Sequence, residues 1–280
     1  MPVNGDKTDT LKKNRVLLLD GYSLAYRAFF ALPETLGTSS GQVTNAVFGF
    51  TSMLIKLEAE ERPDAVIACM DKGAPQFRLD QYPAYKAGRS ETPQTLRQQF
   101  PLIREVLEAL CLPVVELEGY EADDVLGALS FQASETGIYT RIVTCDLDLL
   151  QLVSPVIGVE VFSQYWPTRI FDVQATRFRF DGLDPAQLPD YKALVGDSSD
   201  NLPGVRGIGA RTASSLLSKY GHLEEIYDDL ENIPSMKLRG SKRVQQLLRE
   251  NYEEAFKMRT LTTIVCDGEI SARCDLGDLL

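Results

Sequence analysis

The chain has 280 residues, of which 44% are hydrophobic, and a formal net charge of −11 at pH 7. This length allows one large domain or two smaller ones, since domains average roughly 150 residues. The five cysteines form no Cys-x-x-Cys pair, which argues against a zinc ribbon and a secreted disulfide framework. No apolar run approaches the roughly 20 residues of a membrane span, and residues 1–14, expected to be a polar tail, are unlike a signal peptide. We therefore expect a cytoplasmic protein with no membrane partner.

The excess of acidic residues argues at first against a nucleic-acid partner, because phosphate binding normally requires a basic field. Nine carboxylates described below are candidate metal ligands. Subtracting these nine from the 40 acidic residues leaves 31 acids against 29 basic residues. The balance is then nearly neutral, so local basic patches decide whether nucleic acid binds.

Three short apolar runs that each end in an aspartate are the first pattern along the chain. They cover residues 15–20, 65–71 and 141–146, and they suit buried strands of a parallel sheet. Helical patterns at 46–57 and 102–110 lie between them. This alternation of strands and helices predicts an α/β fold centred on a parallel sheet.

The three strand ends place Asp20, Asp71 and Asp146 at one edge of the expected sheet. Ligands of such sheets bind outside the carboxyl ends of the strands. A single aspartate after a strand is often only a turn former. Three of them at the same edge favour a shared site.

Two further acidic groups belong to the same edge. Glu121, Asp123 and Asp124 lie at the start of an apolar helical run, and Asp148 follows Asp146 by two residues. Acids in a first helical turn are also favoured by the helix dipole and serve as caps. Three acids within four residues exceed what capping needs.

Carboxylates gathered at one edge require compensating cations. A pair of like charges about 4 Å apart repels by roughly 4 kcal/mol at an effective dielectric near 20. Ligands that are all oxygen suit Mg²⁺ or Mn²⁺. Zinc fits poorly, because the only histidine is His222 and no cysteine pair has ligand spacing.

Residues 72–104, here called the basic segment, leave the strand end that carries Asp71 and would overhang the acids. The segment has more basic than acidic residues, with aromatic residues between them. This mixture is typical of contacts with single-stranded nucleic acid, where cations meet phosphates and rings stack on bases. A solvated basic face is the alternative. The residues concerned are Lys72, Phe77, Arg78, Tyr82, Tyr85, Lys86, Arg89, Arg97 and Arg104.

The pattern becomes helical towards the C-terminus, after a strand expected at 159–162 and an uninformative stretch. We therefore divide the chain into an α/β core at 15–187 and a helical module at 188–280. The expected helices of the module cover residues 191–195, 210–219, 223–230 and 242–258.

Residues 196–209 read Gly-Asp-Ser-Ser-Asp-Asn-Leu-Pro-Gly-Val-Arg-Gly-Ile-Gly. On one turn of helix Asp197 and Asp200 would point the same way and add two candidate metal ligands. The glycines that follow allow backbone amides to approach a phosphate, as in a helix-hairpin-helix. A surface loop is the alternative for a segment of this composition. The candidate phosphate-binding residues are Gly204, Arg206, Gly207, Gly209 and Arg211.

Several longer motifs occur in a fixed order along the chain. They are Leu-Asp-Gly with Tyr-Arg-Ala-Phe-Phe, Tyr-Lys-Ala-Gly-Arg, Glu-Ala-Asp-Asp, Asp-Leu-Asp-Leu-Leu-Gln and Gly-Asp-Ser-Ser-Asp-Asn-Leu-Pro-Gly-Val. Taken together, residues 15–273 resemble the 5′-nuclease, or flap endonuclease-like, family, and most closely the 5′→3′ exonuclease domain of bacterial DNA polymerase I.

The resemblance implies a PIN-like nuclease core, a helical arch within the basic segment and a C-terminal helix-three-turn-helix. It implies catalytic roles near the scissile phosphate for Arg27, Lys86 and Arg89, and places Tyr85 at the base of the arch. It also implies K⁺ held by the carbonyls of the hairpin. One divalent cation would be surrounded by Asp20, Asp71, Glu121, Asp123 and Asp124, and a second by Asp146, Asp148, Asp197 and Asp200.

The expected function is that of a Mg²⁺-dependent, structure-specific 5′ nuclease. Its partner would be DNA with a 5′ flap, a nick or a junction between single strand and duplex, as in primer removal and repair. We expect a monomer, and the resemblance leaves open whether it works with an attached or a separate polymerase. Two alternatives stand beside this reading: an inert DNA-binding module and a metal-dependent ribonuclease with a PIN-like core.

Overall fold

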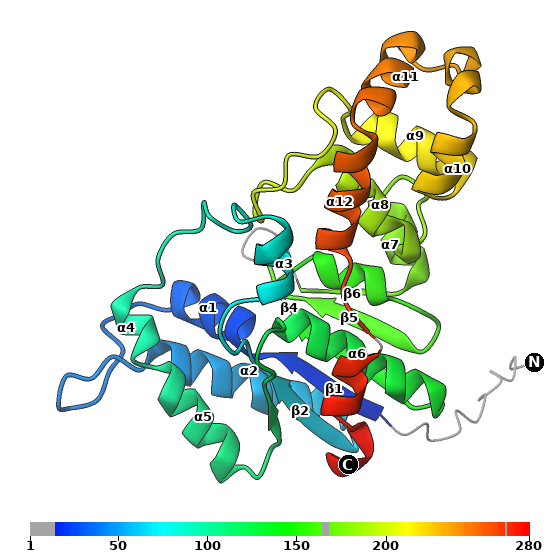
Figure 1. The fold of residues 1–280 in the computed structure, drawn as a ribbon. Coiled ribbons are helices and arrows are strands. Elements are labelled where there is room, and N and C mark those ends of the chain that lie inside the picture. The colour runs from blue at the N-terminus through cyan, green and yellow to red at the C-terminus, as the bar shows by residue number, and fades with distance from the viewer. Residues whose placement is uncertain (1–14, 164–167, 267) are drawn as a thin grey trace, which may run out of the picture.

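The computed structural model describes residues 15–163, 168–266 and 268–280, so the predicted polar tail at 1–14 lies outside the described residues. Its centre is a six-stranded sheet in the order β3-β2-β1-β4-β5-β6 (Figure 1). The strands are β1 Arg15–Asp20, β2 Ala65–Cys69, β3 Val114–Val115, β4 Tyr139–Thr144, β5 Ile157–Val161 and β6 Arg169–Phe171.

The predicted parallel sheet is confirmed. β1 pairs in parallel with β2 and β4, the pairs β2–β3 and β4–β5 are also parallel, and only β5–β6 is antiparallel. The short strands β3 and β6 are not predicted from the sequence. β3 has only two residues, too few for a recognisable alternation, and β6 follows the stretch in which the sequence is uninformative.

Both faces of the sheet are covered by helices, as a parallel sheet requires. Alternate side chains of β1 enter different cores: Leu17 and Leu19 pack among residues of α1, α2 and α5, whereas Val16 and Leu18 pack among residues of α6. Figure 1 shows α6 crossing one face while α1, α2 and α5 lie on the other. These helices are α1 Gly21–Ala31, α2 Asn45–Glu61, α5 Phe100–Ala109 and α6 Ala122–Glu135.

The basic segment contains two short helices, α3 Gln76–Gln81 and α4 Gln94–Arg97, and enters α5. Residues 83–88 between α3 and α4 form successive turns. The helical arch implied by the resemblance is therefore mostly a turn-rich loop over the sheet edge in this structure.

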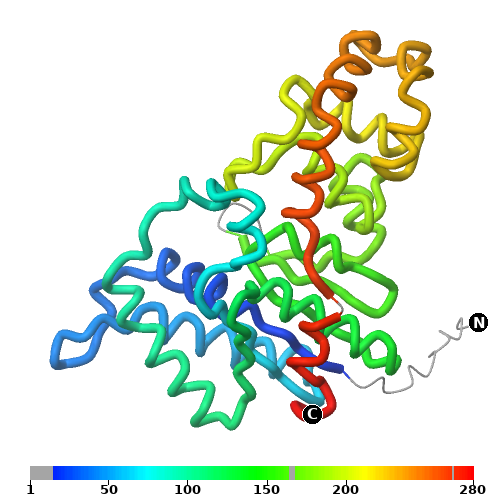
Figure 2. The backbone as a smooth tube through the Cα atoms, in the orientation of Figure 1, coloured from blue at the N-terminus to red at the C-terminus, as the bar shows by residue number. Residues whose placement is uncertain are grey.

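The helical module extends away from the sheet (Figure 2). The helix predicted over 242–258 is wrong in its continuity, because the chain breaks between α11 and α12 at Asn251, where φ is −118° and ψ is 27°. The amide of Asn251 donates to the carbonyl of Leu247 at 2.7 Å and ends α11. The module contains α8 Leu188–Val195, α9 Ala210–Tyr220, α10 Leu223–Asp228, η3 Leu230–Ser235, α11 Ser241–Glu250 and α12 Tyr252–Thr262, where η marks a 3-10 helix. The elements η1 Asp148–Leu152, α7 Val173–Arg179 and η2 Pro185–Gln187 precede it.

The end of the chain departs from the predicted division at residue 188. After α12 it returns to the sheet core, where Ile264, Ile270, Cys274 and Leu276 are buried beside residues of α6. The elements of this end are α13 Glu269–Arg273 and η4 Leu276–Asp278. Within the described part of the chain, no helix is long and apolar enough to cross a membrane.

Candidate active site

Asp20 lies at the carboxyl end of β1 and caps α1, with only 5% of its surface exposed. Its side chain accepts the backbone N–H of Ser23 at 3.2 Å and the hydroxyl of Thr144 at 2.6 Å. Burial, followed by the charges of Asp71 and Asp146, raises the pKa of Asp20 to about 7, although the two hydrogen bonds oppose this. Burial is thus the main cause of the raised pKa of Asp20, and the neighbouring acids add to it.

Asp146 and Asp148 follow β4 at the same edge. The N–H of Asp146 donates to the hydroxyl oxygen of Thr144 at 3.0 Å, so one threonine contacts both strand ends. The N–H of Asp148 donates to the carboxylate of Asp146 at 2.8 Å. Burial, and then the charge of Asp146, raises the pKa of Asp148 to about 8, while Lys192 opposes the rise.

The start of α6 brings two more acids to this edge. Glu121 caps the helix, and the N–H of Ala122 donates to the carboxylate of Asp71 at 2.8 Å. Burial raises the pKa of Asp123 well above its ordinary value, and the charges of Asp20 and Asp146 add to this. These helix-start acids are thus electrostatically joined to the strand-end acids.

Five of the predicted ligands line one cavity of about 1060 Å³. Lys86 and Arg89 line it from the basic segment, and Tyr22, Tyr26 and Phe30 line it from α1. Among the described residues, no three histidine, cysteine or carboxylate groups are close enough together to hold a metal ion as they stand. We call the five carboxylates that line the cavity the cavity acids: Asp20, Asp71, Glu121, Asp123 and Asp146.

Three other predicted ligands do not line this cavity, and we call Asp148, Asp197 and Asp200 the turn acids. Lys192 of α8 forms ion pairs with Asp148 and with Asp197, the latter at 2.6 Å. Although burial opposes it, the charge and hydrogen bond of Lys192 lower the pKa of Asp197 to about 2. Lys192, which the sequence analysis did not single out, thus partly neutralises Asp148 and Asp197.

The expectation that Asp197 and Asp200 share a helical turn is wrong. Residues 197 and 202 close a turn through paired backbone hydrogen bonds of 2.8 and 2.7 Å. Asp200 consequently points to Arg89, at 2.7 Å, rather than to Lys192. The reason is Gly196, whose φ of +86° ends α8, and whose added Cβ would lie 2.7 Å from the carbonyl of Leu202.

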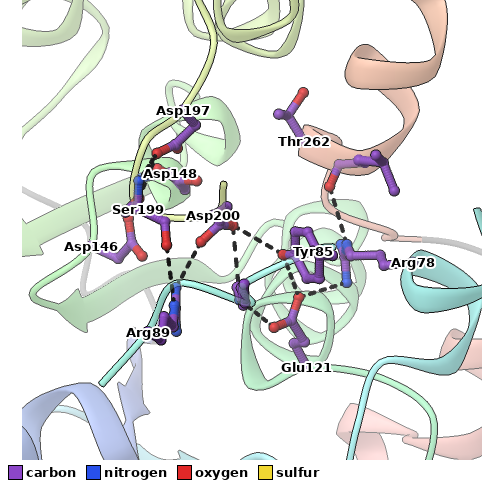
Figure 3. Close-up of polar contacts among 12 residues, drawn as sticks. Arg78, Tyr85, Arg89, Glu121, Asp146, Asp148, Asp197, Ser199, Asp200 and Thr262 are labelled. Atoms are coloured by element: carbon purple, nitrogen blue, oxygen red, sulfur yellow. Dashed lines mark hydrogen bonds and ion pairs between the residues drawn. The ribbon is translucent and has the colours of Figure 1, made fainter. Parts of the chain in front are cut away.

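The base of the basic segment is joined to both acid groups (Figure 3). The hydroxyl of Tyr85 lies 2.9 Å from Glu121 and 3.0 Å from Asp200. Lys86 forms an ion pair with Glu121, and its N–H donates to the carbonyl of Asp200 at 3.0 Å. These contacts hold Lys86 and Arg89 beside the acids.

Asp124 does not join the cavity acids, which corrects its place in the predicted ligand set. It is fully buried, and Arg78 binds its two oxygens at 2.6 and 2.7 Å. It also accepts the N–H of Glu121 at 3.1 Å and of Val265 at 2.9 Å. With both oxygens already bound by donors, Asp124 has a structural role in this arrangement.

Arg27 is also not among the residues that line the cavity. Its guanidinium donates to the carbonyl of Ser163 at 3.2 Å. Arg27 therefore differs from Lys86 and Arg89, which line the cavity.

The predicted hairpin lies directly before α9, and Gly209 is the residue that precedes the helix. Gly204 has a φ of +61° and packs so closely on Gly196 that a Cβ would lie 2.2 Å from its nitrogen. No atom lies within 4 Å of a Cβ built on Gly209, so the start of α9 is open. Arg206 and Arg211 are exposed beside it.

The two parts of the fold match two sequence models of one family. Residues 15–181 match the 5′-3′ exonuclease N-terminal resolvase-like domain. Residues 183–279 match the 5′-3′ exonuclease C-terminal SAM fold. The chain belongs to the 5′-3′ exonuclease family. The predicted family and fold class are thereby confirmed.

The similar curated proteins are longer than this chain. DNA polymerase I of Chloroflexus aurantiacus is 45% identical over 256 residues, which cover 90% of this chain and 26% of that protein. The thermostable DNA polymerase I of Thermus thermophilus is 44% identical over 226 residues, covering 80% and 26%. The chain thus spans about a quarter of the length of these relatives.

Solved structures support the fold at lower identity. The T5 5′-exonuclease with bound divalent metal ions (zinc) is 22% identical, with a TM-score of 0.72 and 90% of each chain covered. The catalytic core of Rad2 in complex with a DNA substrate is 15% identical, with a TM-score of 0.59, covering 92% of this chain and 81% of that one. At these identities the likeness concerns the fold alone.

The sequence analysis missed two polar residues of this site. Thr144 is a fully buried polar residue two positions before a strand-end acid, and its place directly after the apolar pair Ile142 and Val143 is its sequence signal. Lys192 lies five residues before Asp197, and no local pattern distinguishes it from other helical lysines. The turn at 197–202 brings Asp197 to Lys192, and the folding of the chain brings Asp148 there from η1.

Proposed function

We propose that this chain is a 5′→3′ exonuclease and flap endonuclease that hydrolyses DNA phosphodiesters with two or more divalent cations, Mg²⁺ or Mn²⁺. The observation that carries the proposal is the cavity, in which five carboxylates face two basic side chains of the basic segment. The family of the chain supports the reaction class.

The donors present fit hard divalent cations. All candidate ligands are carboxylate oxygens, which suits Mg²⁺ or Mn²⁺. The raised pKa of Asp20, about 7, and the raised pKa of Asp123 mark a site whose repulsion a cation would relieve. The cavity acids would hold one cation; Asp146 together with Asp148, Asp197 and Asp200 would hold a second.

Bound cations would supply an attacking water of lowered pKa and would neutralise charge on the attacking and leaving oxygens. Thr144 would fix the orientation of Asp20 through its 2.6 Å hydrogen bond and support the backbone of Asp146. Lys86 and Arg89 would stabilise negative charge that develops on the phosphate. Their present partners Glu121 and Asp200 hold them at the cavity until DNA binds.

DNA would be held at two places. The aromatic side chains of Tyr22, Tyr26 and Phe30 line the cavity wall and offer faces on which unpaired bases can stack. The open start of α9, with Arg206 and Arg211 exposed beside it, would bind a duplex phosphate. K⁺ at the hairpin, a monomeric state and work beside a polymerase belong to this same proposal, as does a role in primer removal and repair.

The decisive experiment uses a 5′-labelled DNA flap with Mg²⁺, with EDTA, and with the variant Asp146→Asn. We expect cleavage near the junction only with wild-type protein and Mg²⁺, because Asp146 contributes charge to both acid groups. Cleavage that persists in EDTA, or at full rate in the variant, contradicts the proposal. Binding without any cleavage would favour an inert DNA-binding module.

An RNA strand of the same flap geometry tests the ribonuclease alternative. Preference for single-stranded RNA without a duplex requirement would favour that alternative, since a simple ribonuclease has no use for the hairpin before α9. Preference for the junction, on DNA, supports the proposed function.

A further inference from the structure

The chain returns from the helical module to the sheet core through residues 261–265, here called the return segment. Leu261 and Ile264 are buried at 2% and 6% exposure. Ile264 packs on Gly127 of α6 so closely that a Cβ there would lie 2.7 Å from its side chain. Figure 2 shows this segment running from α12 down to the sheet, beside α6.

One side of the return segment is bound by Arg78, which is only 2% exposed. Its guanidinium donates to the carbonyls of Leu261 and Thr263, each at 3.2 Å. The same guanidinium binds both oxygens of Asp124 and lies 3.0 Å from the carboxylate of Glu121. Arg78 therefore connects the return segment to the start of α6, where cavity acids lie.

The other side of the segment is bound by Gln151 of η1. Its side-chain amide donates to the carbonyl of Thr262 and accepts the N–H of Ile264, both at 3.0 Å. The same amide donates to the backbone carbonyl of Asp148 at 3.0 Å. Gln151 therefore connects the return segment to the turn acids.

The two attachments alternate along the chain. Residues 261, 263 and 265 are bound by the pair Arg78 and Asp124, whereas residues 262 and 264 are bound by Gln151. Leu261 and Thr262 are the last residues of α12 and residues 263–265 follow without regular structure, so successive backbone groups at this helix end bridge two separate elements. Arg78 comes from the basic segment and contacts Glu121 and Asp124, whereas Gln151 comes from η1 and contacts the backbone of Asp148.

We propose that Arg78 and Gln151 are positioning residues that clamp the return segment between the two acid groups, so that the docked helical module fixes how the cavity acids and turn acids lie relative to each other. The inference rests on the proposed function of these acids as cation ligands. Loosening either attachment should weaken cation binding and increase cleavage at positions next to the main cleavage site.

The chain offers a matched control in Gln132 of α6. Its amide donates to the carbonyl of Cys274 at 2.8 Å and accepts the N–H of Leu276 at 2.9 Å. It thus makes the same pair of backbone hydrogen bonds as Gln151, to the same C-terminal part of the chain. The difference is that it contacts no residue of either acid group in the hydrogen bonds that the structure describes.

The first test measures Mn²⁺ binding by the full chain without DNA, using Gln151→Met, Arg78→Lys and Gln132→Met in calorimetric titrations. Substituting groups that support metal ligands typically changes metal affinity by 10- to 100-fold. We therefore expect Mn²⁺ to bind about tenfold more weakly to Gln151→Met and Arg78→Lys, and with unchanged affinity to Gln132→Met. An unchanged Mn²⁺ affinity in folded Gln151→Met overturns the proposal. An equal loss in Gln132→Met also overturns it, because the cause would then be general loosening.

The second test maps the cleavage sites of the same variants on a DNA flap at saturating Mg²⁺. We expect products displaced by one or more nucleotides to increase in Gln151→Met and Arg78→Lys but not in Gln132→Met. A product pattern identical to that of wild type in both clamp variants overturns the positioning role. If the wild-type protein does not cleave the flap, the proposed function fails. The Mn²⁺ titration then tests the positioning role of Arg78 and Gln151 by itself.

Discussion

Asp20 and Asp197 belong to one site and are both largely withdrawn from solvent, yet their pKa values are shifted in opposite directions. Burial and two neighbouring acids raise the pKa of Asp20 to about 7. Lys192 lowers the pKa of Asp197 to about 2 against the effect of burial. In the described part of the chain, no ion pair joins Asp20 to a basic side chain. Among the described residues, the fold therefore leaves Asp20 without a basic partner and gives Asp197 one.

Substitution of Asp20 should have the largest effect on cleavage. Ser23 and Thr144 donate to different oxygens of Asp20, so Asp20→Asn keeps one acceptor oxygen, replaces the other by an amide NH2 and removes the charge. Losing several kcal/mol of transition-state stabilisation by a cation should lower flap cleavage about a thousandfold. In EDTA at pH 8 the same variant should melt at a higher temperature than wild type, because repulsion among the cavity acids is relieved.

Asp197→Asn is the matched variant. It should also lose cleavage, but in EDTA it should melt at a lower temperature than wild type, because Lys192 loses an ion-pair partner at 2.6 Å. Opposite signs of the two melting shifts support the comparison. Shifts of the same sign would show that Asp20 and Asp197 do not differ in charge balance.

Removing the neutralising cation is the next largest effect. Lys192→Met leaves Asp148 and Asp197 without their shared partner, and breaking a buried ion pair on one side typically costs about 3 kcal/mol. Urea unfolding in EDTA at pH 8 should reveal this loss, and added Mg²⁺ should restore part of it. The control is Arg177→Met, which breaks the exposed pair of Arg177 and Asp184 and should leave unfolding unchanged. Equal losses in both variants would contradict the assigned role of Lys192.

The strand-end acids were predictable because their signal is local. An apolar run that ends in aspartate needs only neighbouring residues to be recognised, and a parallel sheet then brings Asp20, Asp71 and Asp146 to one edge. The direction in which a side chain points is not a local signal, because it depends on partners from distant segments. Asp123 and Asp124 are adjacent in sequence, but Arg78, 46 residues before Asp124, binds only the second of them.

Contacts between distant segments account for the other differences. Lys192 reaches Asp148 over 44 residues and Gln151 reaches Thr262 over 111 residues, so no periodicity within a window contains them. The break at Asn251 is local, since its side chain and backbone bond to the carbonyl of Leu247, but the residues on both sides favour helix and hide it in the sequence. The packing of Ile264, Ile270, Cys274 and Leu276 beside α6 depends on the apolar surface of that helix, and its sequence predicts burial but not which residues cover it.

The smallest effect is the pH dependence of stability without metal. Asp20 and Asp148 have folded pKa values of about 7 and about 8, against an ordinary value of 3.8. Between about pH 4 and pH 8 the folded state therefore binds more protons than the unfolded state, and its stability must fall as pH rises. The contribution of Asp197, with a folded pKa of about 2, is already complete above about pH 4 and is therefore constant across this window.

In EDTA at constant ionic strength, the melting temperature should fall by roughly 5 °C between pH 6 and pH 8.5, as a loss of about 2 kcal/mol implies for a chain of this size. Mg²⁺ should reverse the slope, because cations bind the ionised carboxylates and displace protons. Asp20→Asn should flatten the profile in EDTA, since it removes one of the two groups responsible. Differential scanning fluorimetry measures all three profiles, and a melting temperature that rises with pH in EDTA would show that the cavity acids do not repel one another.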